Sequence, residues 1–233
     1  MKIALLPGDA RQRYLGELLG GEGHDIVPYA PGEGADAWLF PLPTGDHPAL
    51  EELRPGSLAL VGQARGRHPR LRLRDYYSGE EVQLRNAAIT AEGAIAAAIA
   101  HTERTLLGSR ILILGGGRIS RALAPRLRAL GAAVTVYARR PEERALAEGA
   151  GCETLAALPE RPEGFHLLFN TVPFPLLESV PDCPALELAS APGGFRDKSG
   201  VIPAGGLPGK TAPYSAAEAL LGPIRAILRE ESS

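Results

Sequence analysis

Short apolar runs alternate with amphipathic stretches along the first 75 residues of the chain. Each apolar run is four to six residues long and ends in turn-forming residues such as Pro7-Gly8. Runs of this length bounded by Gly and Pro are typical of buried strands, and the stretches between them have helical spacing. The pattern predicts strands at residues 2–6, 24–29, 36–41 and 57–62, and helices at 10–21 and 47–56.

A second set of alternating segments follows a long alanine-rich stretch that begins at Thr90. We expect this stretch to form a helix with Thr90 as its N-cap and Glu92 in its first turn, where a carboxylate favours the helix dipole. The later segments predict strands at 110–114, 134–137, 167–170, 186–189 and 201–202, and helices at 118–130, 141–149 and 215–229.

Alternation of strands and helices predicts the fold class, which is α/β. We expect two doubly wound domains, each with a parallel sheet. The first comprises residues 1–88 together with the returning C-terminal helix, 213–233, and is the candidate substrate or partner domain. The second, 89–212, contains the linker helix and a Rossmann dinucleotide-binding unit.

Composition narrows the range of functions. The 233 residues are 45% hydrophobic and carry a formal net charge of -2, which gives no global reason to expect nucleic acid or an anionic membrane as a partner. No apolar run approaches the length of a membrane span, and the N-terminal run is too short for a signal peptide. Cys152 and Cys183 lack metal-ligand spacing, so we predict no metal site and reduced thiols in a cytoplasmic protein.

The stretch ILILGGGRIS, residues 111–120, carries the main chemical prediction. A buried strand runs into a glycine loop and then a helix, which is the context that a dinucleotide-binding G-x-G-x-x-G motif requires. Gly115 permits the tight turn and Gly117 allows the backbone to approach a pyrophosphate. Ser120 replaces the third glycine, a small departure. The loop predicts a nicotinamide dinucleotide cofactor, although a plain structural turn is the alternative.

The next strand favours NADP(H) over NAD(H). NAD-binding units usually end this strand with Asp or Glu, which binds the ribose hydroxyls. Here the strand is followed by Arg139 and Arg140, and guanidinium groups pair well with a 2′-phosphate. The alternative is that both arginines are solvated loop residues.

Polar and small residues also follow the later strands, at NTVP (170–173), LASAPGG (188–194) and GLPGKTAP (206–213). Carboxyl ends of parallel strands meet at one sheet edge, where a nicotinamide would lie. Together with the glycine loop they supply the candidate cofactor-binding residues, which are Gly115, Gly117, Arg118, Ile119, Arg139, Arg140, Asn170, Thr171, Pro173, Leu207 and Pro208.

These segments, together with GDARQ (8–12) and the alanine-rich stretch, resemble the A subunit of dipicolinate synthase. The resemblance covers most of the chain from Asn86 onward and the first twenty residues. It implies a substrate domain followed by a Rossmann domain, and oxidation of a dihydrodipicolinate to dipicolinate with NADP. It also implies a second, flavoprotein-like subunit as partner and a role in making spores.

The chain departs from the family pattern at two positions. The family usually has Arg after the Ser of its L-A-S motif, where this chain has Ala191, and Pro where it has Ile89. Another cation, Arg11 or Lys210, would then hold a substrate carboxylate. The candidate substrate-binding residues are Arg11, Thr90, Ser190 and Lys210.

Asp9 and Glu92 are the candidate catalytic bases, and we expect them to face the cleft between the domains. Each has a structural alternative, since Asp9 can cap the first helix and Glu92 can complement the helix dipole. Two other functions stay open. One is a different dehydrogenase, acting on a 2-hydroxy acid or a shikimate-like substrate, and the other is a non-catalytic nucleotide-binding subunit. A homo-oligomer is also possible from the sequence.

Overall fold

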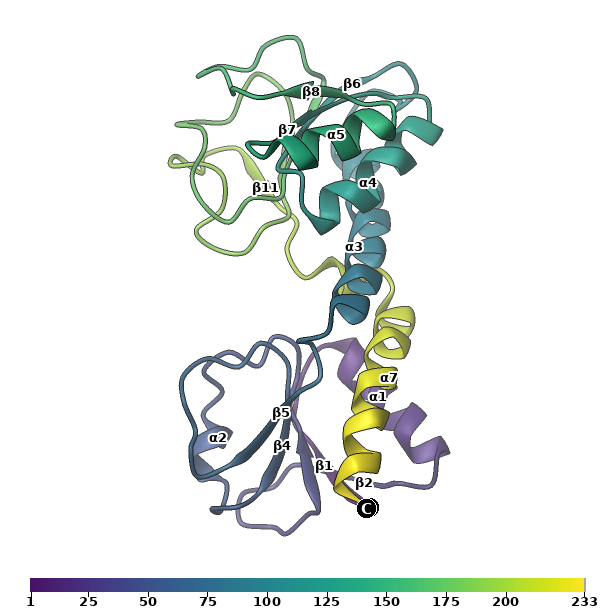
Figure 1. Ribbon diagram of the computed structural model, residues 1–233, viewed down its shortest axis with the longest axis vertical. Coiled ribbons are helices and arrows are strands. Elements are labelled where there is room, and N and C mark those ends of the chain that lie inside the picture. The colour runs from purple at the N-terminus through teal and green to yellow at the C-terminus, as the bar shows by residue number, and fades with distance from the viewer. Residues whose placement is uncertain (233) are drawn as a thin grey trace. The chain divides into compact units, whose positions relative to one another are not determined.

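The computed structural model describes residues 1–232, which form two compact units (Figure 1). Unit 1 comprises Met1–Asn86 and the C-terminal segment from Pro208 onward, and unit 2 comprises Ala87–Leu207. Among the described residues, no helix combines the length and the apolar character needed to cross a membrane.

Unit 1 is built on a five-stranded parallel sheet of order β2-β1-β3-β4-β5. Its strands are β1 (Lys2–Leu5), β2 (Asp25–Pro28), β3 (Ala37–Leu39), β4 (Leu58–Val61) and β5 (Arg72–Asp75), and its helices are α1 (Ala10–Gly21), α2 (Ala49–Glu52) and α7 (Pro213–Glu231). The strand order reverses between β1 and β3, and in open α/β sheets ligands bind at the carboxyl ends of the strands at such a point. The loops after β1 and β3 are therefore the natural ligand-binding region of unit 1.

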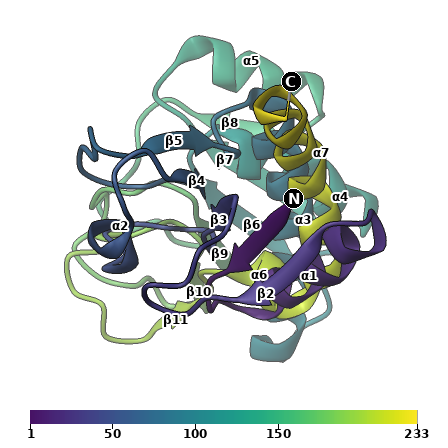
Figure 2. The same cartoon turned by 90° about the horizontal axis from the view of Figure 1, so that it is seen from below.

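Alternate residues of these strands enter two separate cores, one on each face of the sheet. Ile3 and Leu39 pack with apolar residues of α1 and α7, which lie side by side on one face (Figure 2). Ala4 and Trp38 point to the other face and pack with α2. The C-terminal helix thus completes the hydrophobic core of a unit whose remaining residues come from the start of the chain.

Unit 2 is built on a six-stranded parallel sheet of order β11-β10-β9-β6-β7-β8. Its strands are β6 (Arg110–Leu114), β7 (Ala133–Tyr137), β8 (Glu153–Leu155), β9 (Leu167–Asn170), β10 (Ala185–Glu187) and β11 (Val201–Pro203). In chain order this is the arrangement of a Rossmann sheet, with the reversal between β6 and β9. Its helices are α4 (Arg118–Ala129) and α5 (Pro141–Gly149), while α3 (Glu80–His101) and α6 (Leu207–Thr211) cross the boundary between the units.

The two faces of this sheet are covered differently. Ile111 and Ile113 of β6 pack with α3 and α4. Leu112 and Leu114 point to the opposite face, where Leu177 and other residues from the long loops between β9 and β11 cover the sheet. The connections from β9 to β10 and from β10 to β11 contain no helix in this described segment, so loop backbone forms much of the carboxyl edge of the sheet.

The predicted fold class is confirmed, because both sheets are wholly parallel and doubly wound. The prediction that the long helix begins at Thr90 is wrong. Helix α3 begins at Glu80, with Glu80 and Glu81 in its first turn, and nothing between 80 and 90 interrupts it. Thr90 therefore does not cap this helix, and Glu92 lies in its fourth turn, where it cannot serve as a first-turn partner of the dipole.

Candidate dinucleotide-binding site

The glycine loop turns sharply from β6 into α4. Gly115 has φ of +102°, a conformation that side chains rarely adopt, and its N–H donates to the carbonyl of Tyr137 at 2.8 Å. A Cβ at this position would lie 2.5 Å from Oγ1 of Thr171. Gly115 is thus required both by its backbone angle and by the closeness of the loop after β9.

The next two glycines face different surroundings. A Cβ on Gly116 would lie 2.6 Å from Cβ of Glu143, so the loop packs closely against α5. Gly117 is the N-cap of α4, and a Cβ built on it meets no atom within 4 Å. Gly117 therefore borders open space at the N-terminus of α4, and a helix N-terminus is where a pyrophosphate is commonly bound.

The glycine loop forms one side of a cavity of about 560 Å³, which lies wholly within unit 2. Its walls are the loops that follow β6, β7 and β9 at the carboxyl edge of the sheet. The lining residues are Gly115, Gly116, Gly117, Tyr137, Ala138, Arg139, Arg140, Pro141, Glu143, Thr171, Val172, Pro173, Phe174 and Leu176. Six of the predicted cofactor-binding residues belong to this set.

Two arginines after β7 face this cavity. The Arg139 guanidinium carbon lies 4.7 Å from the centre of the Phe174 ring, a cation–π contact across the end of β6, since β6 separates β7 from β9 in the sheet. Nε of Arg140 donates to Oε1 of Glu143 at 3.0 Å, and this carboxylate raises the pKa of Arg140 further above its usual value. The structure thus places a carboxylate, Glu143, beside Arg140.

Asn170 ends β9, and Thr171 follows it at the side of the cavity opposite the two arginines. Thr171 lines the cavity, and its hydroxyl donates to the carbonyl of Leu114 at 2.7 Å. Asn170 is fully buried, and its amide nitrogen donates to Glu187 Oε1 at 2.6 Å and to the carbonyl of Val172 at 2.8 Å. Asn170 is not a lining residue, so its role in this conformation is to hold the neighbouring loops.

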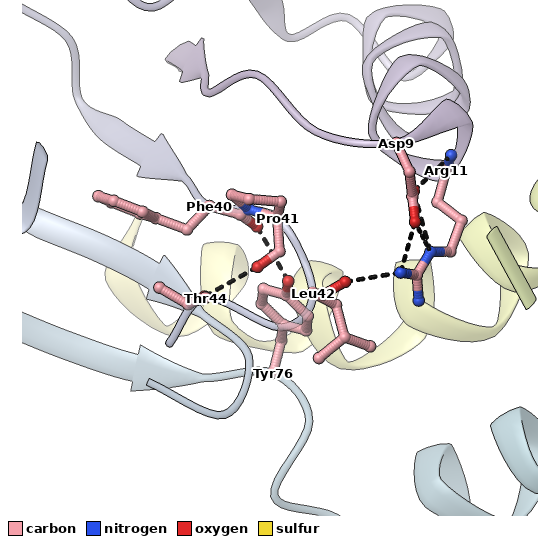
Figure 3. Close-up of polar contacts among 7 residues, drawn as sticks. All are labelled: Asp9, Arg11, Phe40, Pro41, Leu42, Thr44 and Tyr76. Atoms are coloured by element: carbon pink, nitrogen blue, oxygen red, sulfur yellow. Dashed lines mark hydrogen bonds and ion pairs between the residues drawn. The ribbon is translucent and has the colours of Figure 1, made fainter. Parts of the chain in front are cut away.

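In unit 1, Asp9 and Arg11 form a close pair at the start of α1 (Figure 3). Oδ1 of Asp9 accepts the backbone N–H of Arg11 at 3.0 Å, which confirms the N-cap interpretation of Asp9. The same carboxylate accepts Nε and Nη2 of Arg11, the latter at 2.6 Å. Both residues follow β1 at the point where the strand order of unit 1 reverses.

The loop after β3 is fixed by buried polar contacts, also drawn in Figure 3. Nη2 of Arg11 donates to the carbonyl of Leu42 at 2.6 Å, and the Tyr76 hydroxyl donates to the carbonyl of Phe40 at 2.9 Å. Burial raises the pKa of Tyr76 well above its usual value, so this hydroxyl remains a donor. A Cβ on Gly209 would lie 2.1 Å from Oδ2 of Asp9, so the backbone of α6 also approaches the pair.

The remaining predicted site residues lie elsewhere within their own units. In unit 2, Glu92 is exposed, 4.0 Å from Arg126 of α4, and does not line the cavity. Ser190 is exposed, and its carbonyl accepts the N–H of Gly193. The other positions are exposed Arg118, half-buried Ile119, buried Thr90 and Leu207 in unit 2, and exposed Lys210 and buried Pro208 in unit 1.

Sequence reasoning missed three residues at these sites. Glu143 follows Arg140 by three positions, a spacing at which side chains in the first turn of a helix lie side by side. Phe174 directly follows, and Glu187 directly precedes, a segment that was recognised for its small polar residues. Neither has a local motif that would mark it, because their contacts join strands that are far apart in the sequence.

Comparisons with known proteins agree with this geometry. Residues 83–174 match the family model described as the NAD binding domain of D-isomer specific 2-hydroxyacid dehydrogenases. The match supports a nicotinamide dinucleotide cofactor and an oxidoreductase of the dehydrogenase type. It covers β6 to β9 and every residue that lines the cavity except Leu176.

Relatives found by sequence and by structure carry the same name. The dipicolinate synthase A subunit of Bacillus subtilis (strain 168) is 32% identical over 168 residues, which are 66% of this chain and 57% of that protein. The crystal structure of the same subunit from Bacillus subtilis aligns over 100% of this chain and 97% of its own, with a TM-score of 0.83 and 24% identity. The crystal structure of the corresponding subunit from Bacillus halodurans has the same TM-score and identity and covers 97% of each chain.

The sequence match spans less than two thirds of the curated relative, and the structural matches establish the fold. The resemblance that the sequence motifs indicated is therefore confirmed, and this chain is similar in sequence and in fold to the A subunit of dipicolinate synthase.

Proposed function

We propose that this chain is an NADP(H)-dependent oxidoreductase that converts a dihydrodipicolinate to dipicolinate as one subunit of a dipicolinate synthase. The observation that carries the proposal is the cavity at the glycine loop. It combines open space at Gly117 with two guanidinium groups at the end of β7, the position where NAD-binding units usually hold a carboxylate.

The choice of NADP(H) rests on the charges around the end of β7. Arg139 is exposed and its guanidinium lies over the ring of Phe174, so it can turn to a 2′-phosphate at small cost. Arg140 already pairs with Glu143, which offsets one of the two positive charges. Arg139 is therefore the principal phosphate ligand, and Arg140 contributes when it exchanges its partner.

In this reaction the protein binds the substrate and the cofactor, aligns them for hydride transfer, and accepts the proton that the substrate releases. A hydride leaves an sp3 ring carbon, a proton leaves a neighbouring atom, and the ring becomes aromatic. The oxidised nicotinamide, when bound, supplies the hydride acceptor. Thr171 and Pro173 form the wall of the cavity after β9 and orient the nicotinamide half, while the N-terminus of α4 holds the pyrophosphate.

The substrate's two carboxylates need cationic partners, and Arg11 is the first candidate. It lies at the strand-order reversal of unit 1, where its Nε and Nη2 are held by Asp9 and Leu42, so its position is set before substrate arrives. Lys210, Ser190 and Thr90 remain further proposed contacts. Asp9 and Glu92 remain the proposed bases, of which Asp9 is already committed to capping α1 and pairing with Arg11.

The similarity to dipicolinate synthase A subunits also suggests a partner, a cellular location and a biological role for this chain. We expect a second, flavoprotein-like subunit as partner, a cytoplasmic location and a role in making spores, and we also propose a homo-oligomer. The second candidate function is a non-catalytic nucleotide-binding subunit. It is favoured by one observation, the uncharged Ala191 where the family usually has Arg. A different dehydrogenase is the third candidate, but enzymes of that kind normally carry a catalytic His or a Lys–Asp pair in the cleft, and the sequence identifies neither.

The cofactor assignment is tested by fluorescence titration with NADPH and NADH. We expect tighter binding of NADPH by the parent protein. Arg139→Ala should weaken NADPH binding by about 1–3 kcal/mol, the scale of a charge-assisted hydrogen bond, and leave NADH binding unchanged. Arg104→Ala is the matched control, since Arg104 is an exposed arginine of unit 2 that does not line the cavity. Equal affinity of the parent protein for the two cofactors would overturn the assignment.

A further inference from the structure

A single carboxylate joins the two loops at the carboxyl ends of β9 and β10. Oε1 of Glu187 accepts Nδ2 of Asn170 at 2.6 Å and the N–H of Ala189 at 3.0 Å. Oε2 accepts the N–H of Gly194 at 2.8 Å. Glu187 ends β10, so one side chain fixes the end of β9 and both ends of the following loop, residues 188–194.

The buried Asn170 amide extends this network toward the cavity. Its Oδ1 accepts the N–H of Val172 at 3.2 Å, and its Nδ2 donates to the carbonyl of the same residue. The oxygen and the nitrogen of the Asn170 amide are therefore both hydrogen-bonded, and these bonds fix the backbone path at the start of residues 171–174. These four residues all line the cavity, on the side that follows β9.

Two glycines show how closely the loops approach one another. A Cβ on Gly194 would lie 2.4 Å from Cγ of Asn170, and a Cβ on Gly193 would lie 2.5 Å from Oε2 of Glu187. The carbonyl of Gly194 accepts the N–H groups of Leu176 and Leu177 at 2.8 and 3.1 Å. The loops after β9 and β10 are thus bound together from both sides of Gly194.

The charge of Glu187 is balanced by hydrogen-bond donors. In the part of the chain that the structure describes, no Lys, Arg or His forms an ion pair with it. An ionised carboxylate is an acceptor only, and it suits a position where two N–H groups and one amide NH2 converge. A neutral amide would present an NH2 group to at least one of these donors, whichever way it turned.

We propose that Glu187 is a positioning residue that holds the two strand-end loops in register and thereby shapes the nicotinamide end of the cavity. The inference rests on the proposed function for its effect on cofactor binding. In a Rossmann unit the first half, β6 to β8, receives the adenosine part and the second half, from β9 onward, receives the nicotinamide part. Glu187 belongs to the second half, so its removal should affect one part of the cofactor and spare the other.

The test uses the full-length protein with Glu187→Gln, compared with Glu163→Gln. Glu163 is an exposed glutamate of the same unit that precedes β9 and does not line the cavity at the glycine loop. Amide hydrogen exchange is measured without cofactor at Val172, Ala189 and Gly194. Binding of NADPH and of adenosine 2′,5′-bisphosphate is then titrated. The bisphosphate carries the adenosine end alone, so it reports whether the first half of the site survives.

For Glu187→Gln we expect hydrogen exchange at the three amides to become at least about tenfold faster, and NADPH binding to become about tenfold weaker. Both effects follow because a buried donor is left without an acceptor. Bisphosphate affinity should stay within about twofold, and the control should change nothing. Unchanged exchange rates at the three amides would overturn the proposal. An equal loss of affinity for NADPH and for the bisphosphate would also overturn it. If the parent protein fails to bind NADPH, the proposed function is contradicted, and the exchange rates alone decide on Glu187.

A second variant tests the proposal independently, in case Glu187→Gln does not fold. Gly194→Ala adds a methyl group against the Asn170 amide while Glu187 is retained. It should raise exchange at Val172 and weaken NADPH binding more than bisphosphate binding. Gly205→Ala is its control, because a Cβ there meets nothing within 4 Å. Identical behaviour of the two glycine variants would also overturn the proposal.

Discussion

Gly117→Val should abolish cofactor binding while the fold survives. The Cβ of the new side chain would enter open space, and the backbone at Gly117, with φ of -77° and ψ of -166°, is extended and accessible to any residue. The added methyl groups would occupy the space above the first turn of α4 that a pyrophosphate needs. The substitution therefore separates binding from folding.

The expected magnitudes follow from these contacts. Loss of a favourable N-cap residue costs about 1 kcal/mol of folding stability. Exclusion of the pyrophosphate from the helix N-terminus removes charge-assisted hydrogen bonds worth about 1.5–3 kcal/mol each, so NADPH affinity should fall roughly 100-fold or more. Gly117→Ser refines the test, because Ser is a preferred N-cap and should keep stability while its side chain still hinders the phosphate.

Gly116→Ala is the matched comparison. Its Cβ would lie 2.6 Å from Cβ of Glu143 and 3.0 Å from Cβ of Ala138, atoms that cannot rotate away. Overpacking of this kind costs about 1–3 kcal/mol of stability. The assay pairs urea unfolding, followed by circular dichroism, with NADPH titration. Undiminished NADPH binding by Gly117→Val would refute the reasoning and reduce the glycine loop to a structural turn.

Other substitutions test the ion pairs that stabilise unit 1 and the residues proposed to bind substrate. Arg74→Ala should lower the free energy of unfolding by about 1–2 kcal/mol, because the Glu231 side chain is only 9% exposed and loses one of its arginine partners. The exposed Arg13, changed to Ala, should cost less than about 0.5 kcal/mol in the same urea experiment. Arg11→Lys keeps the charge but loses the planar fork, so KM for the substrate should rise about tenfold with little change in kcat; an unchanged KM would remove Arg11 from the substrate site. Glu92→Gln should lower kcat about 100-fold without loss of cofactor affinity if it is the base, whereas an unaltered kcat would assign proton removal elsewhere.

Local patterns were sufficient to predict most of the elements. The helix at 10–21 and the strands at 110–114 and 167–170 have the predicted bounds, because each is closed by glycines or by a change in hydrophobic period. Strand β5 was not predicted, since Arg72 and Arg74 make it look like an irregular basic segment. Those arginines pair with Glu230 and Glu231 of α7, a long-range contact that local patterns cannot reveal.

In the candidate site, too, residues within a local motif could be predicted from the sequence, and residues that act through long-range contacts could not. Gly115, Gly117 and Arg139 were found because a dinucleotide loop requires fixed residue types at fixed spacing. Thr90 was misplaced because a cap residue before an alanine run resembles a helix start, while the preceding segment is equally helical. Glu187 was missed because its three partners come from two loops and its importance depends on their packing.

The most direct test of the account is a coupled assay of dipicolinate formation. The chain is combined with its partner subunit, the product of dihydrodipicolinate synthase and either NADP or NAD, and the absorbance of the reduced cofactor and of the aromatic product is followed. The account predicts equal amounts of NADPH and pyridine dicarboxylate, with a slower reaction with NAD. Absence of aromatic product with the partner supplied would contradict the oxidoreductase assignment and favour a nucleotide-binding subunit without catalytic activity.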